Sequence, residues 1–581
     1  MKLPKLLKRI PKTPEHRKSL RQDRLLLLLS AILIGAGFSP SPAPFLLFFG
    51  LIPFFIVIER RKTFVDVNRA AFLMFFLLGF ITIYWVGGFT QAKDVFLMTG
   101  GFILFFINPI MFLISSTLYF LWREFVHRRS AIFIMPFFWL FYEYLYTLTD
   151  WSFPWLQMHN GISGFVHYIQ IADIIGGWGL TVLIVFTNVL FFSAWQNRSS
   201  KRKHAFGLAT GAVLLIVIPL LYGVIQLSPR KELHRSINVG VTQPNIDPYD
   251  KWGEQQYDKI LAQQLAKSRE LLQGNPELGV GTVDSVDGNF DIINAKPVEQ
   301  RRNFDLLLWP ETAIPVYLMT AGYTDIQDSL YALVDSNHVT LLTGMPDFRM
   351  FIKGEKMPQD VKYSKRGGYY YGTYNSVLEF QPGTRQFQRY GKMKLVPFGE
   401  HVPFVDQFPI FGEFIKWGVG MTGWNVGKDT TVFTFKPAGF TDSVKVGAVV
   451  CYESIYSDLV TELAVKGAQC LIVVTNDSWY GNTSGPYQHR DFARLRAVET
   501  RREVVRCANG GISCFIDKFG RITKQTKMYE SATLAGTVLL SDESTFYMRH
   551  PHVFISLATI FSLFCIGGAI TGKMRKKALF S

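Results

Sequence analysis

The chain has 581 residues, of which 49% are hydrophobic and only 18% are charged, whereas soluble domains average about 25% charged residues. This composition excludes a disordered chain, and five cysteines in so long a chain exclude a scaffold held together by disulfides. The formal net charge of +16 would suit a nucleic-acid-binding protein, so the position of the charged residues decides what it means.

Long apolar runs dominate the N-terminal part of the chain, and one more lies near the C-terminus. A run of about 18 or more apolar residues is long enough to cross a membrane as a helix. The runs lie at residues 25–38, 45–58, 70–89, 95–122, 131–148, 166–195, 205–227 and 552–571. The first two are short and form either two short spans or one re-entrant hairpin. We therefore expect a multi-pass α-helical membrane domain of about eight helices, with about seven spans in residues 25–227 and one in residues 551–572.

Basic residues mark one side of these predicted helices. The tail 1–24, the connectors after the second, fourth and sixth runs, and the tail 573–581 together hold 24 Lys and Arg but only five Asp and Glu. The alternate connectors hold a single basic residue, Lys93. By the positive-inside rule, both tails are predicted to be cytoplasmic, and residues 228–550 are predicted to lie on the opposite side of the membrane. The basicity thus reflects topology, and no nucleic-acid partner is expected.

Residues 228–550 have the pattern of a globular domain in which short β-rich runs alternate with helical patterns at 254–272, 454–467 and 489–506. Such alternation favours a layered α/β fold, and strands that are apolar throughout indicate a sheet covered on both faces. Residues 275–303 are polar and predict an irregular insertion. We find no phosphate loop, dinucleotide motif or metal-ligand cluster in the sequence, so neither a cofactor nor a metal is expected.

Several residues capable of chemistry follow the predicted strands, where sites form in α/β sheets. Glu311 follows one apolar strand, and Cys451 stands between another strand and a helical pattern. A thiol at a helix N-terminus has a lowered pKa, so Cys451 is a candidate nucleophile. Lys392, Lys394 and Glu400 flank a third apolar segment. Each of these residues taken alone is explained equally well as a turn, an ion pair or a core residue.

Taken together, these segments resemble the nitrilase superfamily both in their order along the chain and in the residues of their motifs. The matching motifs are Trp-Pro-Glu at 309–311, Leu-Val-Pro-Phe-Gly-Glu at 395–400, Cys-Tyr-Glu at 451–453, Asn-Asp-Ser-Trp-Tyr-Gly at 476–481 and Gly-Pro-Tyr-Gln-His at 485–489. With apolar runs on both sides of the domain, the chain resembles the apolipoprotein N-acyltransferases of the bacterial inner membrane. The resemblance implies an αββα sandwich for residues 228–550.

The resemblance also implies a catalytic triad of Glu311, Lys392 and Cys451. In this triad Cys451 is the nucleophile, Glu311 is the general base, and Lys392 stabilises the oxyanion. Lys394 stands where the family usually has His, and the spacing to the Leu-Val-Pro-Phe-Gly-Glu motif selects Lys392. Supporting residues are expected to be Glu400, Glu453, which would fix the local turn, and Tyr452, which would line the pocket. The expected substrate-binding residues are Trp252, Trp155, Trp479, Asn375, Phe404 and Trp417.

The reaction implied by the resemblance is a ping-pong acyl transfer through a Cys thioester. The donor is the sn-1 acyl chain of a phospholipid, typically phosphatidylethanolamine, and the acceptor is the N-terminal amine of a diacylglyceryl-Cys apolipoprotein. The catalytic domain would be periplasmic. Two alternatives remain open from the sequence: a membrane-tethered amidase or acyltransferase with a different amine acceptor, and a non-catalytic scaffold that binds lipid or lipoprotein.

Three further features carry weaker predictions. The aromatic-rich segment 401–424 is expected to form a lid that dips into lipid, the alternative being a loop packed on its own domain. The Arg-rich stretch 490–506 is interpreted as a solvated or ion-paired helix face rather than as a lipid-phosphate site. Glu143 and Asp173 lie within apolar runs, where carboxylates are costly, and no role is assigned to them.

Overall fold

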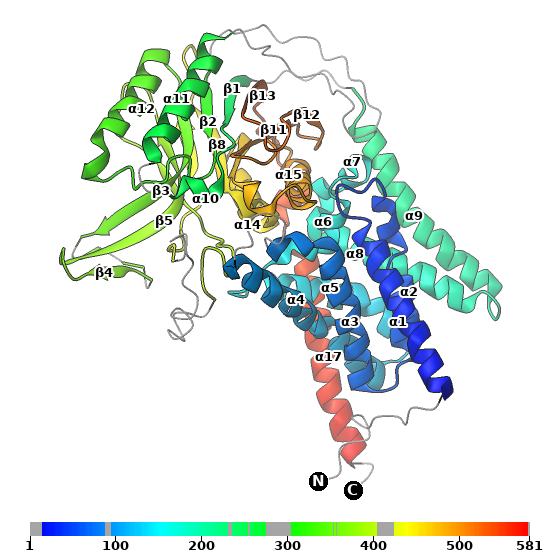
Figure 1. Cartoon of the computed structure of the whole chain (residues 1–581). Coiled ribbons are helices and arrows are strands. Elements are labelled where there is room, and N and C mark those ends of the chain that lie inside the picture. The colour runs from blue at the N-terminus through cyan, green and yellow to red at the C-terminus, as the bar shows by residue number, and fades with distance from the viewer. Residues whose placement is uncertain are drawn as a thin grey trace. The chain divides into compact units, whose positions relative to one another are not determined.

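The computed structural model describes residues 14–87, 95–229, 235–253, 256–274, 304–352, 354–355, 357–358, 360–403 and 423–578. The chain divides into two compact units (Figure 1). The helical unit comprises residues 1–87, 99–227 and 550–581, and the α/β unit comprises residues 88–98 and 228–549.

The helical unit is built from the predicted apolar runs. Its longer helices are α1 (Pro14–Gly35), α2 (Ile52–Arg60), α3 (Phe64–Thr82), α4 (Val95–Leu121), α5 (Ala131–Thr147), α8 (Ala172–Asn197), α9 (Arg202–Gln226) and α17 (Val553–Ala578). Within the described residues, five helical segments are long and apolar enough to cross a membrane: Phe64–Thr82, Met98–Val126, Ala172–Asn197, Arg202–Gln226 and Val553–Gly572. The expected count of eight spans remains a prediction, because α2 has only nine residues and α5 only 17.

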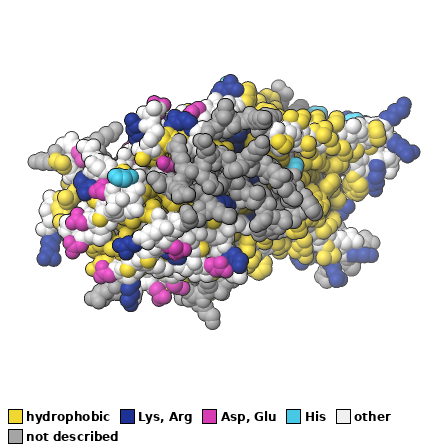
Figure 2. All heavy atoms as spheres, turned by 90° about the horizontal axis from the view of Figure 1, so that it is seen from above, with side chains coloured by type: hydrophobic (Ala, Val, Ile, Leu, Met, Phe, Trp, Pro, Cys, Tyr) yellow, Lys and Arg dark blue, Asp and Glu magenta, His cyan; other side chains and the backbone are white. Residues whose placement is uncertain are grey.

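The surface of the helical unit is strongly apolar (Figure 2). Large apolar side chains on α9 and α17 are exposed, among them Phe206, Ile218, Leu221, Ile225, Ile560, Leu563 and Phe564. Because hydrocarbon is the favourable environment for such faces, this unit is embedded in the membrane. The predicted run 166–195 is not one helix. The short helix α7 (Val166–Ile169) precedes α8, and Gly176, with a φ of 63°, interrupts α8.

A buried carboxylate ties three helices of this unit together. Glu143 on α5 accepts hydrogen bonds from Trp139 Nε1 at 2.9 Å and from the Met158 amide, at the start of α6 (Met158–Ile162), at 2.8 Å. Its other oxygen accepts from Thr181 Oγ1 on α8 at 2.9 Å. The second carboxylate noted in the apolar runs, Asp173, accepts from the Tyr222 hydroxyl on α9 at 2.9 Å. Both carboxylates therefore have hydrogen-bond donors within the unit.

Two β-sheets form the centre of the α/β unit. The first has the order β13-β1-β2-β3-β5-β4, with β6 paired to β5, and the second has the order β12-β11-β10-β9-β8-β7. The strands of the first sheet are β1 (Ser236–Gln243), β2 (Leu306–Trp309), β3 (Thr340–Phe351), β4 (Lys362–Ser364), β5 (Tyr369–Phe380), β6 (Arg389–Gly391) and β13 (Ala532–Leu539). Those of the second are β7 (Val432–Phe435), β8 (Val444–Val450), β9 (Cys470–Thr475), β10 (Val504–Ala508), β11 (Cys514–Ile516) and β12 (Ile522–Gln525).

Helices cover the outer face of each sheet (Figure 1). The helices α11 (Tyr257–Gln273) and α12 (Thr324–Asn337) pack on the first sheet, and α14 (Ser457–Val465) and α15 (Gly485–Thr500) pack on the second. The inner faces of the two sheets contact each other through pairs such as β5 with β8 and β1 with β10. This four-layer arrangement confirms the predicted αββα sandwich. The strands β2 and β9 are buried on both faces, and so is β8 except at the exposed Lys445, which explains why these strands are almost entirely apolar.

Two boundaries differ from the sequence expectation. The predicted helix 489–506 ends at Thr500, because Arg501 takes the left-handed conformation with a φ of 49° and terminates it. Val504 then begins strand β10, where a β-branched pair suits a pleated, buried position. The pattern at 454–467 becomes a short 3-10 helix, η7 (Cys451–Ile455), followed by α14. The predicted insertion 275–303 lies outside the described residues.

Candidate active site

The residues that carry the predicted chemistry follow strands of the two facing sheets. Glu311 follows β2 and Lys392 follows β6 in the first sheet, and Cys451 follows β8 in the second. Because β5 and β8 are in contact, the sandwich brings the ends of these strands together. All three side chains are buried, with exposed fractions of 6%, 0% and 5% respectively.

Glu311, Lys392, Asn375 and Glu400 form one hydrogen-bonded cluster. Lys392 Nζ lies 2.8 Å from Glu400 Oε1 and 3.5 Å from Glu311 Oε1. Asn375 Nδ2, on β5, donates to Glu311 Oε1 at 2.7 Å and to Glu400 Oε1 at 3.1 Å. The main chain fixes the lysine as well, because the Lys392 amide donates to the Asn375 carbonyl at 2.8 Å. Two carboxylates, the buried Glu311 and the partly buried Glu400, thus share one ammonium and one amide.

This cluster keeps Lys392 charged. Burial alone would lower the pKa of Lys392, but the carboxylates of Glu400 and Glu311 outweigh it and raise the pKa above its ordinary value. Lys394 is differently placed, because its Nζ lies 5.1 Å from the ring centroid of Tyr456 and burial lowers its pKa. Of these two lysines, the geometry therefore puts Lys392 beside the carboxylates, where a fixed positive charge can stabilise an oxyanion.

Cys451 stands at a strained turn between β8 and η7. Its φ of 54° lies in the left-handed region, which costs a non-glycine residue about 1–3 kcal/mol and recurs at functional turns. The expectation that its thiol pKa is lowered is wrong. Burial raises the pKa of Cys451, the carboxylate of Glu311 raises it further, and the ammonium of Lys392 only partly opposes them. The thiol is therefore protonated at rest and needs a base before it can attack.

A buried network holds the carbonyl of Cys451. Ser454 Oγ donates to this oxygen at 2.9 Å, and His489 Nε2 lies 3.0 Å from it. The other ring nitrogen of His489 lies 2.8 Å from Asp477 Oδ1, and Arg506 donates to Asp477 Oδ2 at 2.8 Å. Burial alone would raise the pKa of Asp477, but His489 and Arg506 together hold it at about 2.

Three side chains of this region, Cys451, Asp477 and His489, are of types that can bind a metal ion. Their ligand atoms all lie within 4.8 Å of one another. However, both oxygens of Asp477 are engaged by His489 and Arg506, and both ring nitrogens of His489 face protein acceptors. The side chains of Asp477 and His489 are thus already engaged in bonds within the protein, and these bonds fix the turn at Cys451.

Glu453 joins the turn at Cys451 to the segment that carries Lys392. Its Oε2 accepts from the Val450 amide at 2.8 Å. Its Oε1 accepts from the Tyr390 hydroxyl at 2.8 Å and from the amides of Met393 and Lys394 at 2.6 and 3.1 Å. One carboxylate therefore sets the position of the thiol relative to the ammonium, which agrees with the turn-fixing role expected for Glu453.

Several residues of the site had no specific signal in the sequence. Lys251, at the end of α10 (Pro248–Lys251), donates to the Glu311 carbonyl at 3.0 Å and to Thr312 Oγ1 at 2.8 Å. Burial lowers the pKa of Lys251 to about 7, against the opposing charge of Glu311. His489 and Asp477 were visible only as parts of the motifs at 485–489 and 476–481, and their pairing with each other depends on the fold.

The predicted substrate-binding residues are dispersed. Trp252 and Trp479 are half-buried in the α/β unit, and the Trp479 ring contacts Tyr249 at 5.4 Å. Trp155 is fully buried in the helical unit, with its ring 4.7 Å from Trp85 and 5.5 Å from Phe153. Phe404 and Trp417, and most of the expected lid, lie outside the described residues.

Asn375 and Tyr452 both have buried side chains. Asn375 contacts the carboxylates of the triad cluster, and its Oδ1 has no hydrogen-bond partner among the described residues. The role expected for Tyr452, lining the pocket at Cys451, stays a prediction. The Tyr452 side chain is fully buried, with its hydroxyl 2.6 Å from that of Tyr456.

The Arg-rich stretch is ion-paired but not solvated. Its six arginines, all at most 8% exposed, are Arg490, Arg494, Arg496, Arg501, Arg502 and Arg506. Arg490 and Arg494 both pair with Asp491, and Arg496 pairs with Glu499. Of the two alternatives in that interpretation, the ion-paired one is confirmed. The side chains are buried rather than solvated, because the stretch runs from a helix packed on the second sheet into the interior strand β10.

Comparisons with known proteins agree with this architecture. The carbon-nitrogen hydrolase family matches residues 238–545, which is more than half of the chain, and the apolipoprotein N-acyltransferase N-terminal domain matches residues 30–190. Apolipoprotein N-acyltransferase of Chlorobaculum tepidum is 29% identical over 93% of this chain and 95% of its own length. The same-named protein of Geobacter metallireducens is 26% identical over 94% of each chain.

Among solved structures, Saccharomyces cerevisiae Nit3, a member of branch 10 of the nitrilase superfamily, is 15% identical. The match covers 57% of this chain and 97% of Nit3, with a TM-score of 0.34. The sequence motifs, the αββα sandwich and the two family matches lead to one conclusion. The chain belongs to the carbon-nitrogen hydrolase family, in the branch that joins this domain to an apolipoprotein N-acyltransferase N-terminal domain.

Proposed function

We propose that this protein transfers an acyl chain from a membrane phospholipid to the N-terminal amine of a diacylglyceryl-Cys lipoprotein, through a thioester on Cys451. One observation carries the proposal: the Glu311 carboxylate and the Lys392 ammonium are paired with each other, and the charges of both shift the pKa of the buried Cys451 thiol. The relatives named apolipoprotein N-acyltransferase and the apolar helical unit support a lipid donor and a lipoprotein acceptor.

The first half of the reaction forms the thioester. Glu311 takes the proton from Cys451 as the sulfur attacks the sn-1 ester carbonyl of the phospholipid. The oxyanion that develops is stabilised by the charge of Lys392, which Glu400 and Asn375 hold in place. When the ester C–O bond breaks, the proton passes from Glu311 to the departing glycerol oxygen, and a lysophospholipid leaves.

The second half of the reaction forms the amide. The amine of the lipoprotein attacks the thioester carbonyl, and Glu311 accepts a proton from the nitrogen. As the C–S bond breaks, Glu311 passes this proton to the sulfur, which regenerates the Cys451 thiol and the ionised base. The unpartnered Oδ1 of Asn375 lies beside Glu311 and can accept a hydrogen bond from the incoming amine. Exclusion of water favours aminolysis over hydrolysis, which suits a thiol that is 5% exposed.

We further propose that phosphatidylethanolamine is the donor and that the protein lies in the bacterial inner membrane. Both termini would be cytoplasmic, and the α/β unit would be periplasmic. The positive-inside distribution of 24 basic residues against five acidic ones supports this orientation. The site would then meet both substrates at the outer leaflet of that membrane.

Intact mass spectrometry of the full-length protein tests the proposal. After incubation with phosphatidylethanolamine, wild type should gain one acyl mass, and hydroxylamine should release it. Cys451→Ala should gain none, whereas Cys514→Ala, which removes a buried thiol on β11, should behave as wild type. Addition of a diacylglyceryl-Cys peptide should discharge the adduct, and the N-acetylated peptide should not. The absence of an adduct on folded wild type would contradict the proposal.

A further inference from the structure

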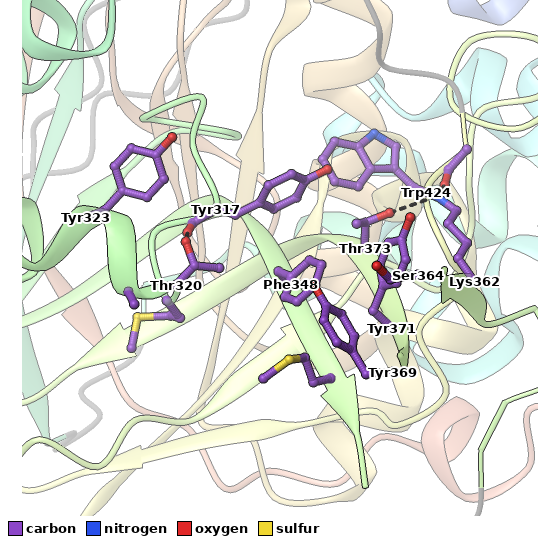
Figure 3. A pocket seen from close by; sticks show the side chains of 14 residues that line it. Tyr317, Thr320, Tyr323, Phe348, Lys362, Ser364, Tyr369, Tyr371, Thr373 and Trp424 are labelled. Atoms are coloured by element: carbon purple, nitrogen blue, oxygen red, sulfur yellow. Dashed lines mark hydrogen bonds between the residues drawn. The ribbon is translucent and has the colours of Figure 1, made fainter. Parts of the chain in front are cut away.

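A pocket of about 900 Å³ opens in the α/β unit beside the reaction centre (Figure 3). Its walls come from the segment after Glu311, from the hairpin of β3 and β5, from β4, and from residues 423–424. The lining consists of aromatic rings, thioethers, hydroxyls and one ammonium, and no Asp or Glu lines it among the described residues. The volume lies in the upper part of the range for small-molecule sites.

The pocket and the reaction centre share strand β5. Thr373 lines the pocket, and Asn375, two residues along the strand, holds Glu311. Residues two apart on a strand point to the same face and lie about 7 Å from each other. Asn425, next to the lining residue Trp424, pairs with the main chain of Thr373 at 2.6 and 2.7 Å. The pocket is therefore linked through β5 to Asn375, which holds the Glu311 carboxylate.

Lys362 supplies the positive charge of the pocket. Its Nζ donates to Thr373 Oγ1 at 3.1 Å and to the Gly423 carbonyl at 2.6 Å. An ammonium has three donors, so one remains without an acceptor among the described residues. The carboxylate of Asp360, whose charge acts on Lys362, is engaged elsewhere, because its Oδ2 accepts from Asn425 Nδ2 and from the Val426 amide, both at 3.1 Å. Lys362 thus has a hydrogen bond to offer to an anion.

Aromatic rings form the rest of the wall. Tyr317 points across the pocket toward Trp424, with a centroid separation of 6.4 Å, and its ring lies 5.9 Å from that of Phe348 (Figure 3). The Tyr371 ring stacks on the Phe348 ring with a centroid separation of 5.2 Å, and the Tyr369 ring lies 6.1 Å from that of Tyr371. Ring faces attract ammonium groups, and their attraction needs no carboxylate. The pocket therefore offers one donor for an anion and several faces for a cation.

We propose that this pocket receives the zwitterionic headgroup of the phospholipid donor, with the phosphodiester at Lys362 and the ammonium among the rings of Tyr317 and Trp424. A glycerophospholipid carries its sn-1 ester and its phosphate on the same glycerol, which matches a pocket next to the site of attack. The inference rests on the proposed function and assigns to it a headgroup subsite. An anionic headgroup without an amine would satisfy Lys362 but not the rings.

Thioester formation with two donors of identical acyl chains, phosphatidylethanolamine and phosphatidylglycerol, tests the assignment in the full-length protein. Wild type should prefer the ethanolamine lipid. Lys362→Met should raise the half-saturating concentration of both donors about tenfold, because both lose the contact to phosphate. Tyr317→Leu should raise it about tenfold for the ethanolamine lipid alone, and Tyr317→Phe, which keeps the ring, should restore the preference.

Matched controls come from the same hairpin. Lys365→Met and Tyr363→Leu remove an exposed charge and an exposed ring that do not line the pocket, and both should behave as wild type. Soluble glycerophosphoethanolamine should compete with the donor on wild type, and glycerophosphoglycerol should compete more weakly, a measurement that needs no variant to fold.

Three results would overturn the inference. If Lys362→Met and Tyr317→Leu are folded and use both donors as wild type does, the pocket is not the headgroup site. If they impair only the discharge of a preformed thioester by the diacylglyceryl-Cys peptide, the pocket takes the acceptor instead. In both cases the wild-type thioester still forms, and the proposed function stands. If wild type forms no thioester with either lipid, the proposed function and the headgroup site fall together.

Discussion

Two neighbouring regions on strand β5 hold charge in opposite ways. Around Asn375 the charged side chains form a closed cluster, in which Lys392 lies between Glu311 and Glu400. These side chains have almost no access to solvent. At Thr373, two residues away, the pocket is open, and Lys362 faces it from among aromatic rings. A closed cluster is preorganised for charge that develops during a reaction, whereas an open cation is suited to a charge that the ligand brings.

The comparison separates chemistry from recognition along one strand. Substitutions in the closed cluster should change the rate of the chemical step with little effect on which donor is used. Substitutions in the pocket should change which donor is used with little effect on the maximal rate. The following predictions test the closed cluster first, then the network behind it, and last the membrane-embedded unit.

Lys392→Met should have the largest effect. It leaves two buried carboxylates beside each other without a cation, and removal of one partner from a buried ion pair costs about 3–5 kcal/mol of stability. It also removes the charge opposite the oxyanion, so the rate of thioester formation should fall at least about 1,000-fold. The rate, followed by mass spectrometry below the unfolding temperature, checks this. Lys394→Met is the control, and a Lys392→Met rate within tenfold of wild type would exclude the role of Lys392.

Glu311→Gln should slow thioester formation about 100- to 10,000-fold, the usual contribution of a general base. Because burial is the largest cause that raises the pKa of Cys451 and it persists in the variant, the thiol is still mostly protonated at neutral pH. Below that pKa, each increase of one pH unit raises the thiolate population about tenfold, so the rate of the variant should rise with pH in that proportion. Wild type, which carries its own base, should climb less steeply. Parallel pH profiles of the two proteins would argue against Glu311 as the base.

Asp477→Asn should weaken the support of the Cys451 turn and the stability of the α/β unit. The folded-state pKa of Asp477, about 2, lies below its ordinary 3.8, so its ionised form contributes about 2 kcal/mol of stability above pH 4 or so. That contribution is lost as the pH falls from about 4 toward 2. The difference in unfolding temperature between wild type and Asp477→Asn should therefore shrink over this pH range.

The exposed Asp328 provides a control for this measurement, because Asp328→Asn should change stability by less than about 0.5 kcal/mol at any pH. If the difference between wild type and Asp477→Asn is constant from pH 5 to pH 2, the ion pair with Arg506 and His489 does not stabilise the fold. Slowed thioester formation in folded Asp477→Asn would show in addition that the network positions the nucleophile.

The triad could be predicted because each member lies in a local motif that carries the family resemblance: Glu311 and Cys451 follow apolar strands, and Lys392 precedes an apolar segment. The neighbours that tune the triad could not be predicted in the same way. Asn375 reaches Glu311 only through the pairing of β5 with β3, and the thiol pKa of Cys451 is raised by a carboxylate 140 positions earlier in the chain. The pocket has no motif at all, because its walls come from four separate segments. Long-range pairing, and not residue type, decides these features.

The smallest effect is expected in the helical unit, at Glu143. This carboxylate is held by three hydrogen-bond donors and, within the part of the chain that the structure describes, pairs with no cation, unlike Glu311 and Glu400. Glu143→Gln keeps an acceptor for Trp139 and Met158, so its cost should stay below about 1 kcal/mol. Glu143→Leu leaves all three donors unsatisfied, at about 1–3 kcal/mol each, and should lower the unfolding temperature clearly.

Neither change at Glu143 should alter thioester formation at temperatures where the protein is folded, because the carboxylate has a structural role and the chemistry resides in the α/β unit. Unfolding temperatures and thioester rates measured on the same samples separate the two contributions. A folded Glu143→Gln protein that no longer forms the thioester would contradict the assignment of a structural role to Glu143 and of the chemistry to the α/β unit. The charge itself, and not its hydrogen bonds, would then matter, and a carboxylate in the membrane-embedded unit would belong to the reaction as much as the closed cluster at Asn375 does.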